Sequence, residues 1–242
     1  PTASFWDCGE FIAVSYKLMV PHPPGAPLFL MIGRMFSLLA GDDVTQVAYY
    51  VNMVSALCSA FTIPFLYWSI VYLATRLVKK DTKPGDLPLW DQVLVMAAGA
   101  VGATAYTFSD SFWFSGVEAE VYAASSLFTA IVFWAVMKWD SIAEEENADK
   151  WLIFIAYVIG LSIGVHLLSL LAVPSLAFIY YFKKYKPTAM GTVLAFVAGY
   201  GGIFLIQSVI IPGLPSIAAK IEIFSKNSIG LPFNTGTIIF FL

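Results

Sequence analysis

The chain has 242 residues, of which 59% are hydrophobic and only 12% are charged, and its net charge is −3 at neutral pH. Soluble domains carry about 25% charged residues, so a surface of this composition faces lipid for the most part. The weak, thinly spread charge excludes a nucleic-acid-binding footprint, and a count of two cysteines excludes a disulfide framework.

The polar N-terminal stretch, residues 1–22, holds the first candidate catalytic and binding residues. Asp7 and Glu10 stand three apart and share one face of a helix expected to run to Met19. Such a carboxylate pair can hold a metal, or one member can act as a base that the other orients. Capping of the helix by Asp7 is the alternative. His22 opens the run His-Pro-Pro-Gly, where it could contact an anion at the start of the next helix.

Segment 24–40 is apolar, but Arg34 lies near its middle, where burial in hydrocarbon is costly. We therefore expect 24–40 to lie along the outer membrane surface as a juxtamembrane helix. A spanning helix needs about 20 mostly apolar residues. The predicted membrane segments are 46–78, 91–108, 119–138, 151–168, 169–183, 188–211 and a last one from 233.

Basic residues determine the predicted orientation, because cytoplasmic loops gather lysine and arginine. Three clusters hold nine of the thirteen basic residues: Arg76, Lys79, Lys80 and Lys83; Lys138 and Lys150; Lys183, Lys184 and Lys186. Placing all three inside puts residues 1–22, 109–118 and 212–232 outside.

Two further polar groups fall on the outer side under this topology. Glu118 and Glu120 open a membrane segment, where a carboxylate complements the positive end of the helix dipole. The dipole accounts for one acid, and the second, beside Tyr122 and other aromatic residues, favours a site. His166 is expected at the outer end of span 151–168. An ionisable residue there suggests function, although a backbone carbonyl can satisfy a lone histidine.

The run SFWDCGEFIAVSYKLMVPHPPGAPLFLMIGRMFSL, at 4–38, resembles the DUF2723 family, also called glycosyltransferase family 117. Vertebrate relatives of its transmembrane protein 260 type are protein O-mannosyltransferases. The aspartate–glutamate loop, the HPPG run and the apolar helix of the family pattern are all present, and FWFSGVEAEVYA and GLSIGVHLLSLLAVP are similar to other family segments. The resemblance covers nearly the whole chain. It implies an all-α polytopic membrane protein of GT-C type, a transmembrane helical bundle with external juxtamembrane helices.

The function that the resemblance implies is transfer of a sugar, in the first instance mannose, from a polyprenyl-phosphate carrier to an acceptor hydroxyl such as a protein Ser or Thr. Asp7 would be the general base, aided by Glu10. His22 and Arg34 would steady the lipid phosphate. The residues that would line the same cavity and hold the sugar or the acceptor are Glu118, Glu120, Tyr122 and His166.

We expect one transmembrane glycosyltransferase domain over 1–242, with the first external loop at 1–45 and six to seven membrane segments at 46–242. The expected partners are the lipid-linked sugar, an acceptor protein or glycan, membrane lipids and a larger membrane complex, without nucleic acid. A divalent metal is left open. The expected location is a bacterial inner membrane with the site facing the periplasm. Because the chain starts without Met and stops in an apolar run, we expect a fragment of a longer protein.

Other functions remain open at this point. The same fold could use a lipid or glycan acceptor, because acceptor choice depends on external loops. Broken helices and polar residues within the membrane would also suit a transporter, but the sequence has no inverted repeat and its charges gather at one face. A structural subunit of a membrane assembly is the remaining alternative.

Overall fold

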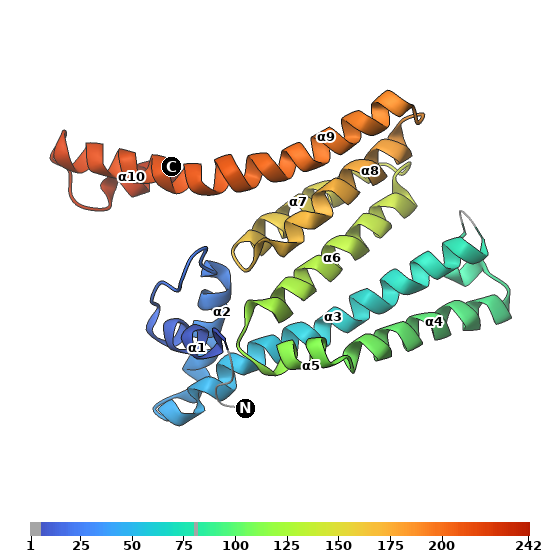
Figure 1. Cartoon of the computed structure of the whole chain (residues 1–242), viewed down its shortest axis with the longest axis horizontal. Helices are drawn as coiled ribbons and strands as arrows, with labels where there is room; N and C mark the ends of the chain where they lie inside the picture. The colour runs from blue at the N-terminus through green and yellow to red at the C-terminus, as the bar shows by residue number, and fades with distance from the viewer. Residues whose placement is uncertain (1–5, 80–81) are drawn as a thin grey trace. The chain divides into compact units, whose positions relative to one another are not determined.

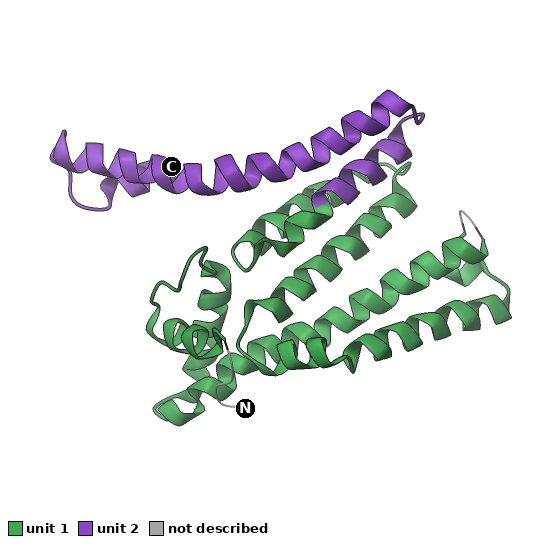
Figure 2. Ribbon diagram, viewed as in Figure 1, with its two compact units in different colours: residues 1–172 green, residues 173–242 purple. Residues whose placement is uncertain are grey.

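The computed structural model describes residues 6–79 and 82–242, so Lys80 of the first basic cluster lies outside the described residues. The described part of the chain consists of helices and their connections, without a strand. The all-α fold predicted from the sequence is therefore confirmed. The chain divides into two compact units, Pro1–Ala172 and Val173–Leu242 (Figure 2), and each is described by itself.

The first unit begins with two short helices and continues with helices that are longer except for α5 (Figure 1). They are α1 (Cys8–Lys17), α2 (Pro27–Ser37, extended by a 3-10 turn at Leu38–Ala40), α3 (Val47–Val78), α4 (Leu89–Thr107), α5 (Asp110–Val117), α6 (Val121–Ile142) and α7 (Lys150–Ile163). A 3-10 turn, Leu167–Leu171, follows α7. The remaining elements are α8 (Ala172–Lys184), α9 (Ala189–Leu205), a π-turn (Ile206–Ile210), α10 (Ile211–Asn227) and α11 (Thr235–Phe241).

Several helices of the described chain have the length and composition of membrane spans. Four qualify alone: Val44–Val78, Val121–Ile142, Leu167–Lys184 and Ala189–Asn227. Helices α4 and α5, bent by 62° at a short break, add a fifth if they are counted as one span. The chain is thus a polytopic integral membrane protein. The helices predicted at 46–78, 91–108, 119–138 and 169–183 are found close to the predicted bounds.

The helix predicted after the HPPG run is α2. Pro27 occupies its first turn, where the missing N–H of proline costs no helical hydrogen bond. With its 3-10 extension the apolar helix covers Pro27–Ala40 and falls in the shorter class, below the length of a span. This length agrees with a helix that does not cross the membrane, and its position at the outer surface stays a prediction.

The span predicted at 151–168 is wrong in its second part, because helix α7 ends at Ile163. His166 therefore does not lie on a helix but in extended backbone, with φ −161° and ψ 149°. Its Nδ1 accepts a hydrogen bond from the backbone N–H of Leu168 at 3.1 Å and caps the 3-10 turn that follows. Side chains that bond nearby backbone groups in this way compete with helix continuation.

The last predicted span, 188–211, is too short, because the helical run continues from Ala189 to Asn227. The segment 212–232, which was predicted to lie outside, is therefore helical over 212–227, and its side of the membrane stays a prediction. Pro212 stands in the first turn of α10, directly after the π-turn. A proline lacks one helical N–H donor, and a π-turn already interrupts the regular i to i+4 pattern at that point. The helical run consequently continues past Pro212 instead of ending there.

Helices α3 and α6 run side by side in the same direction through the first unit (Figure 1). Near the start of both, the Ser55 hydroxyl donates to the carbonyl of Glu120 at 3.3 Å. Near their ends, the Arg76 guanidinium lies 3.2 Å from the Asp140 carboxylate. The unit therefore has two distinct ends, one with the starts of α3 and α6 and one with the basic residues that follow α3.

A hydrophobic core holds α1 and α2 against the starts of α3 and α6. Its buried members include Phe11, Phe29, Val54, Val121 and Val165. The rings of Phe11 and Phe29 meet edge to face with centroids 5.5 Å apart, a favoured aromatic geometry. This core fixes the short helices and the chain beside His166 at one end of the unit, so the polar groups predicted from the sequence lie at that same end.

Candidate active site

Asp7 stands at the N-cap position of α1, with φ −91° and ψ 0°. Within residues 6–79 and 82–242, its carboxylate makes no capping hydrogen bond to the helix, so helix capping does not explain this side chain. The Asp7 backbone N–H donates instead to the Glu120 carboxylate at 3.1 Å. The carboxylate of Asp7 is half exposed and remains available for chemistry.

Glu10 and His22 form a closely bonded pair beside Asp7. One Glu10 oxygen accepts the backbone N–H of His22 at 2.8 Å, and the other accepts the ring Nδ1–H at 2.9 Å. The second ring nitrogen, Nε2, lies 3.7 Å from Oδ2 of Asp7. The hydrogen bonds from His22 lower the pKa of Glu10, and the bond to Glu10 raises the pKa of His22. Both residues are therefore biased toward their charged forms.

Glu118 and Glu120 are both buried, with exposed fractions of 3% and 5%. Glu120 ends the short segment before α6, and its carboxylate faces the start of α1 through the bond from Asp7. Burial and the nearby charge of Asp7 raise the pKa of Glu120 to about 7. At neutral pH Glu120 can therefore exchange between its protonated and ionised forms.

A pocket of about 340 Å³ opens between these acids and helix α5. Its walls are formed by Trp6, Asp7, Ser111, Phe114, Ser115, Glu118, Glu120 and Tyr122. Pockets of this size hold small ligands. Flat aromatic faces beside carboxylates and hydroxyls suit a polyhydroxylated ligand such as a sugar, since the rings cover its C–H faces and the polar groups accept its hydroxyls.

Ser111 and Ser115 line the pocket but were not predicted as site residues, although they occur in segment 109–118, which was predicted to lie outside. Their spacing of four places both on one face of a helix. The segment was expected to be an external loop, whereas the structure forms α5 there. The spacing of the two serines can be read from the sequence, but it indicates a shared face only if residues 110–117 form a helix.

His166 and Tyr122 come together at the same end of the unit. Their ring centroids are 5.5 Å apart with the planes tilted by 55°. Because Nδ1 of His166 accepts a hydrogen bond from Leu168, its Nε2 carries the proton in the neutral ring. Burial lowers the pKa of His166 and favours this neutral donor form. Tyr122 thus lines the pocket and also contacts His166.

Arg34 lies apart from the carboxylates. Its Nη1 donates to the carbonyl of Tyr16 at 2.7 Å, near the end of α1, whereas Asp7 precedes the start of that helix. The guanidinium also stacks over the Tyr16 ring, 5.4 Å from its centroid. This arrangement ties α2 to α1. The phosphate contact that the sequence analysis assigned to Arg34 stays a prediction.

The carboxylates of Asp7 and Glu10 and the ring of His22 also have the composition of a cation site. One ligand atom from each lies within 4.8 Å of the others. Carboxylate and imidazole donors suit several divalent metals, so these three residues are the ones that could hold such an ion. A metal requirement stays open, as in the sequence analysis.

The chain matches one characterised group of proteins. The family model described as the protein O-mannosyl-transferase TMEM260 N-terminal domain matches residues 7–189, a range that contains the site residues described above except Trp6. A Dictyostelium discoideum protein named protein O-mannosyl-transferase tmem260 is 26% identical over 184 residues, covering 72% of this chain and 20% of that protein. A Mus musculus protein of the corresponding name is 25% identical over 157 residues, covering 65% of this chain and 19% of that protein. The chain thus spans about a fifth of the length of these relatives. No solved structure matches.

Proposed function

Because the chain belongs to the family of the protein O-mannosyl-transferase TMEM260 N-terminal domain, we propose that it forms the catalytic membrane part of a glycosyltransferase. The reaction is transfer of a sugar, mannose in the first instance, from a polyprenyl-phosphate carrier to a Ser or Thr hydroxyl of an acceptor protein. The observation that carries this proposal is the Asp7 carboxylate, which makes no capping bond within the described chain and lines a sugar-sized pocket.

Asp7 is the general base in this proposal. The acceptor oxygen attacks the anomeric carbon of the sugar, the bond from that carbon to the phosphate oxygen breaks, and the electron pair leaves with the lipid phosphate. The acceptor O–H proton passes to a carboxylate oxygen of Asp7. A positioned base of this kind contributes roughly 10²- to 10⁴-fold to rate.

The sugar or the acceptor occupies the pocket beside Asp7. Glu118 and Glu120 accept hydrogen bonds from hydroxyl groups, and the rings of Trp6 and Tyr122 cover apolar faces. Support comes from the mixture of buried carboxylates and aromatic rings in one pocket. His166, which contacts Tyr122, donates from Nε2 at the edge of the same region.

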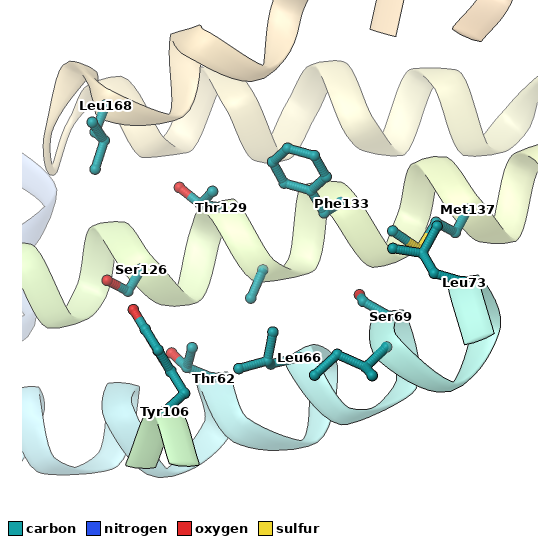
Figure 3. A pocket seen from close by; sticks show the side chains of 12 residues that line it. Thr62, Leu66, Ser69, Leu73, Tyr106, Ser126, Thr129, Phe133, Met137 and Leu168 are labelled. Atoms are coloured by element: carbon teal, nitrogen blue, oxygen red, sulfur yellow. The ribbon is translucent and has the colours of Figure 1, made fainter. Parts of the chain in front are cut away.

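The carrier chain lies in a groove of about 460 Å³ along α3 and α6 (Figure 3). Leu66, Leu73, Phe133 and Met137 are among the apolar side chains that line it, and Figure 3 labels all four. Such a groove within the membrane-spanning helices suits an isoprenoid chain.

The position of this groove supports a lipid-linked donor. Ser126, at the end nearer the candidate site, lies one helical turn after Tyr122 on α6. Leu168, also in the lining, lies two residues after His166. A lipid in the groove would therefore have its head group beside the pocket.

The site faces the periplasm or lumen in this proposal. Support comes from the position of basic residues that follow α3 and flank α6 and α7, at the end of the unit opposite to Asp7. Arg76, Lys79, Lys138 and Lys150 belong to this end. Cytoplasmic ends of membrane helices gather lysine and arginine.

The test is transfer of labelled mannose from polyprenyl-phosphate mannose to protein by the full-length protein in membranes. Asp7→Asn should lower the transfer rate at least about 100-fold with an unchanged amount of protein in the membrane. Asp42→Asn is the matched control, because Asp42 is an exposed aspartate away from the pocket, and its transfer rate should equal that of the wild type. Equal rates for all three proteins would exclude Asp7 as the base, and absence of transfer from this donor would exclude mannose or the protein acceptor.

A further inference from the structure

We propose that a second pocket, at the end of the first unit opposite to Asp7, binds an anionic phospholipid through its phosphate. The pocket has a volume of about 330 Å³ and lies between the last turns of α3 and α6. The inference goes beyond the proposed function, because it concerns neither the sugar donor nor the acceptor. The lining residues that carry it are Trp68, Tyr72, Trp134, Met137, Lys138 and Ser141.

Indole rings form the apolar part of this pocket. Trp68 of α3 and Trp134 of α6 lie with their ring centroids 6.0 Å apart and their planes tilted by 41°. Trp151, at the start of α7, meets Trp134 edge to face at 5.5 Å. Tryptophan gathers at the level where the hydrocarbon of a membrane meets the head groups. Indoles from three helices therefore mark this level, and 47% of Trp68 is exposed to receive a lipid.

The polar part of the pocket lies one helical turn beyond the indoles. Tyr72 follows Trp68 by four residues on α3, and Lys138 follows Trp134 by four residues on α6. Residues four apart share a helix face and differ in height by about 6 Å. The pocket thus runs from apolar rings to a cation in the order of a phospholipid, whose acyl chains and glycerol precede the phosphate.

Lys138 provides the positive charge of the pocket. Its side chain is exposed, and it is the one charged residue among the described residues of the lining. Within residues 6–79 and 82–242 it forms no ion pair. The Ser141 hydroxyl donates to the carbonyl of Lys138 at 2.7 Å, so its oxygen remains an acceptor for a hydroxyl of a head group.

The acid that stands two residues after Lys138 is already bonded to other groups. Asp140 accepts a hydrogen bond from the Tyr72 hydroxyl and lies 3.2 Å from Nη2 of Arg76. Arg76 also donates to the Tyr72 hydroxyl at 2.9 Å. The charges of Arg76 and Asp140 therefore balance each other, and the charge of Lys138 is left for a ligand.

One positive charge matches the single negative charge of a phosphodiester. A zwitterionic head group such as phosphocholine adds a cation, for which the described lining offers no carboxylate. An anionic lipid such as phosphatidylglycerol is therefore the better fit. A soluble phosphate would use Lys138 and leave the indoles uncovered. The proposed orientation of the protein agrees, since it places this end in the cytoplasmic leaflet, where anionic lipids attract lysine and arginine.

The experiment uses the full-length protein, purified in detergent and freed of lipid. Native mass spectrometry gives dissociation constants for phosphatidylglycerol and phosphatidylcholine with identical acyl chains, and thermal unfolding gives a second measure of binding. Lys138→Gln removes the charge of the pocket. Lys150→Gln is the matched control, because Lys150 is an exposed lysine at the start of α7 and does not line the pocket.

The wild type should bind phosphatidylglycerol roughly fivefold more tightly than phosphatidylcholine, the factor for about one lysine beside an anionic lipid. Lys138→Gln should abolish this preference, and Lys150→Gln should keep it. Equal binding of both lipids by the wild type would reduce the contact to bulk lipid only and overturn the proposal. A preference that survives Lys138→Gln, or that Lys150→Gln also removes, would overturn it as well.

Glycerol 1-phosphate separates a lipid site from a site for free phosphate. It should leave the unfolding temperature unchanged at concentrations where phosphatidylglycerol raises it, because it cannot cover the indoles of Trp68 and Trp134. An equal rise with both compounds would replace the lipid by a soluble anion. None of these measurements needs sugar transfer, so failure of the proposed function and failure of this lipid site are seen separately.

Discussion

The backbone N–H of Asp7 donates a hydrogen bond to the carboxylate of Glu120 at 3.1 Å and joins the start of α1 to the start of α6. This bond brings an acid from the N-terminal segment to the wall of the pocket that two later acids form. The negative charge of Asp7 also acts on the buried carboxylate of Glu120. The hydrogen bond lowers the pKa of Glu120, whereas the charge of Asp7 raises it. Burial has the largest effect and also raises the pKa, because it favours the protonated form.

Glu120 should make the stability of the protein depend on pH. Its pKa is raised from 4.5 to about 7 in the folded protein, so the unfolded chain releases this proton first and stability falls as the pH rises through that interval. Glu120→Gln removes this loss. The variant should be more stable than the wild type at pH 8, by at most about 3 kcal/mol, and the difference should shrink toward pH 4.5.

Thermal unfolding in detergent at pH 5 and pH 8 checks this expectation. Glu145→Gln serves as the control, because that acid is exposed and far along the chain from the pocket. A stability difference between Glu120→Gln and wild type that is the same at both pH values would contradict it.

Much of the fold follows from the sequence for clear physical reasons. The long apolar run that forms α3 is expected to cross lipid as a helix, because a helix satisfies all the hydrogen bonds of its own backbone. Pro27 marks the start of α2 in the same direct way. The end of α7 was not predictable, because it depends on the bond from Leu168 to His166. The continuation past Pro212 depends on a π-turn that has no signature in the residues themselves.

The sequence predicted which residues belong to the candidate site better than it predicted how they contact one another. Asp7 and Glu10 were predicted as a pair and His22 as a separate group, and the approach of His22 to the pair depends on Leu18. This residue ends α1 in the left-handed conformation, with φ 50°. The following N–H, of Met19, bonds back to the carbonyl of Val14 at 3.0 Å and turns the chain toward Glu10. Leucine seldom adopts this conformation, so the sequence gives no sign of the reversal.

Arg34 should support stability more than donor binding. Arg34→Gln removes the bond to the Tyr16 carbonyl and the stacking on the Tyr16 ring, and should lower the free energy of unfolding by about 1–3 kcal/mol. Lys17→Gln is the matched control, because Lys17 also lies over Tyr16, 5.0 Å from its ring centroid. It should cost less than about 1 kcal/mol. Unfolding and the KM for the lipid donor are measured together. A raised KM with unchanged stability would instead support the phosphate contact.

The close approach of α1 and α2 should depend on Gly33. A Cβ at this position would lie 2.6 Å from Oγ and 3.0 Å from Cβ of Ser15, whose side chain is fully buried. Gly33→Ala should destabilise the protein by about 1–3 kcal/mol through overpacking. Gly9→Ala is the control, since a Cβ there meets no atom within 4 Å in the described chain.

Ser15→Ala should recover part of this loss, which makes the two positions a double-mutant cycle. The Ser15 hydroxyl is buried without a hydrogen-bond partner among the described residues, so its removal alone should be close to neutral. In the double variant the 2.6 Å contact with Oγ is absent. Additive effects of Gly33→Ala and Ser15→Ala in unfolding experiments would show that the helices do not meet at this point.

The groove along α3 and α6 should bind the carrier chain of the donor (Figure 3). Ala130→Phe places a ring among the lining residues of α6 and should raise the KM for a long-chain polyprenyl donor about tenfold, equivalent to about 1.4 kcal/mol. A short-chain analogue with the same head group does not reach far into the groove, so its KM should change little. Ala98→Phe adds the same ring to an exposed face of α4 outside the groove and should affect neither donor. An equal rise for both donors in Ala130→Phe would mean that the ring disturbs the site itself, because chain length is the one feature in which the two substrates differ.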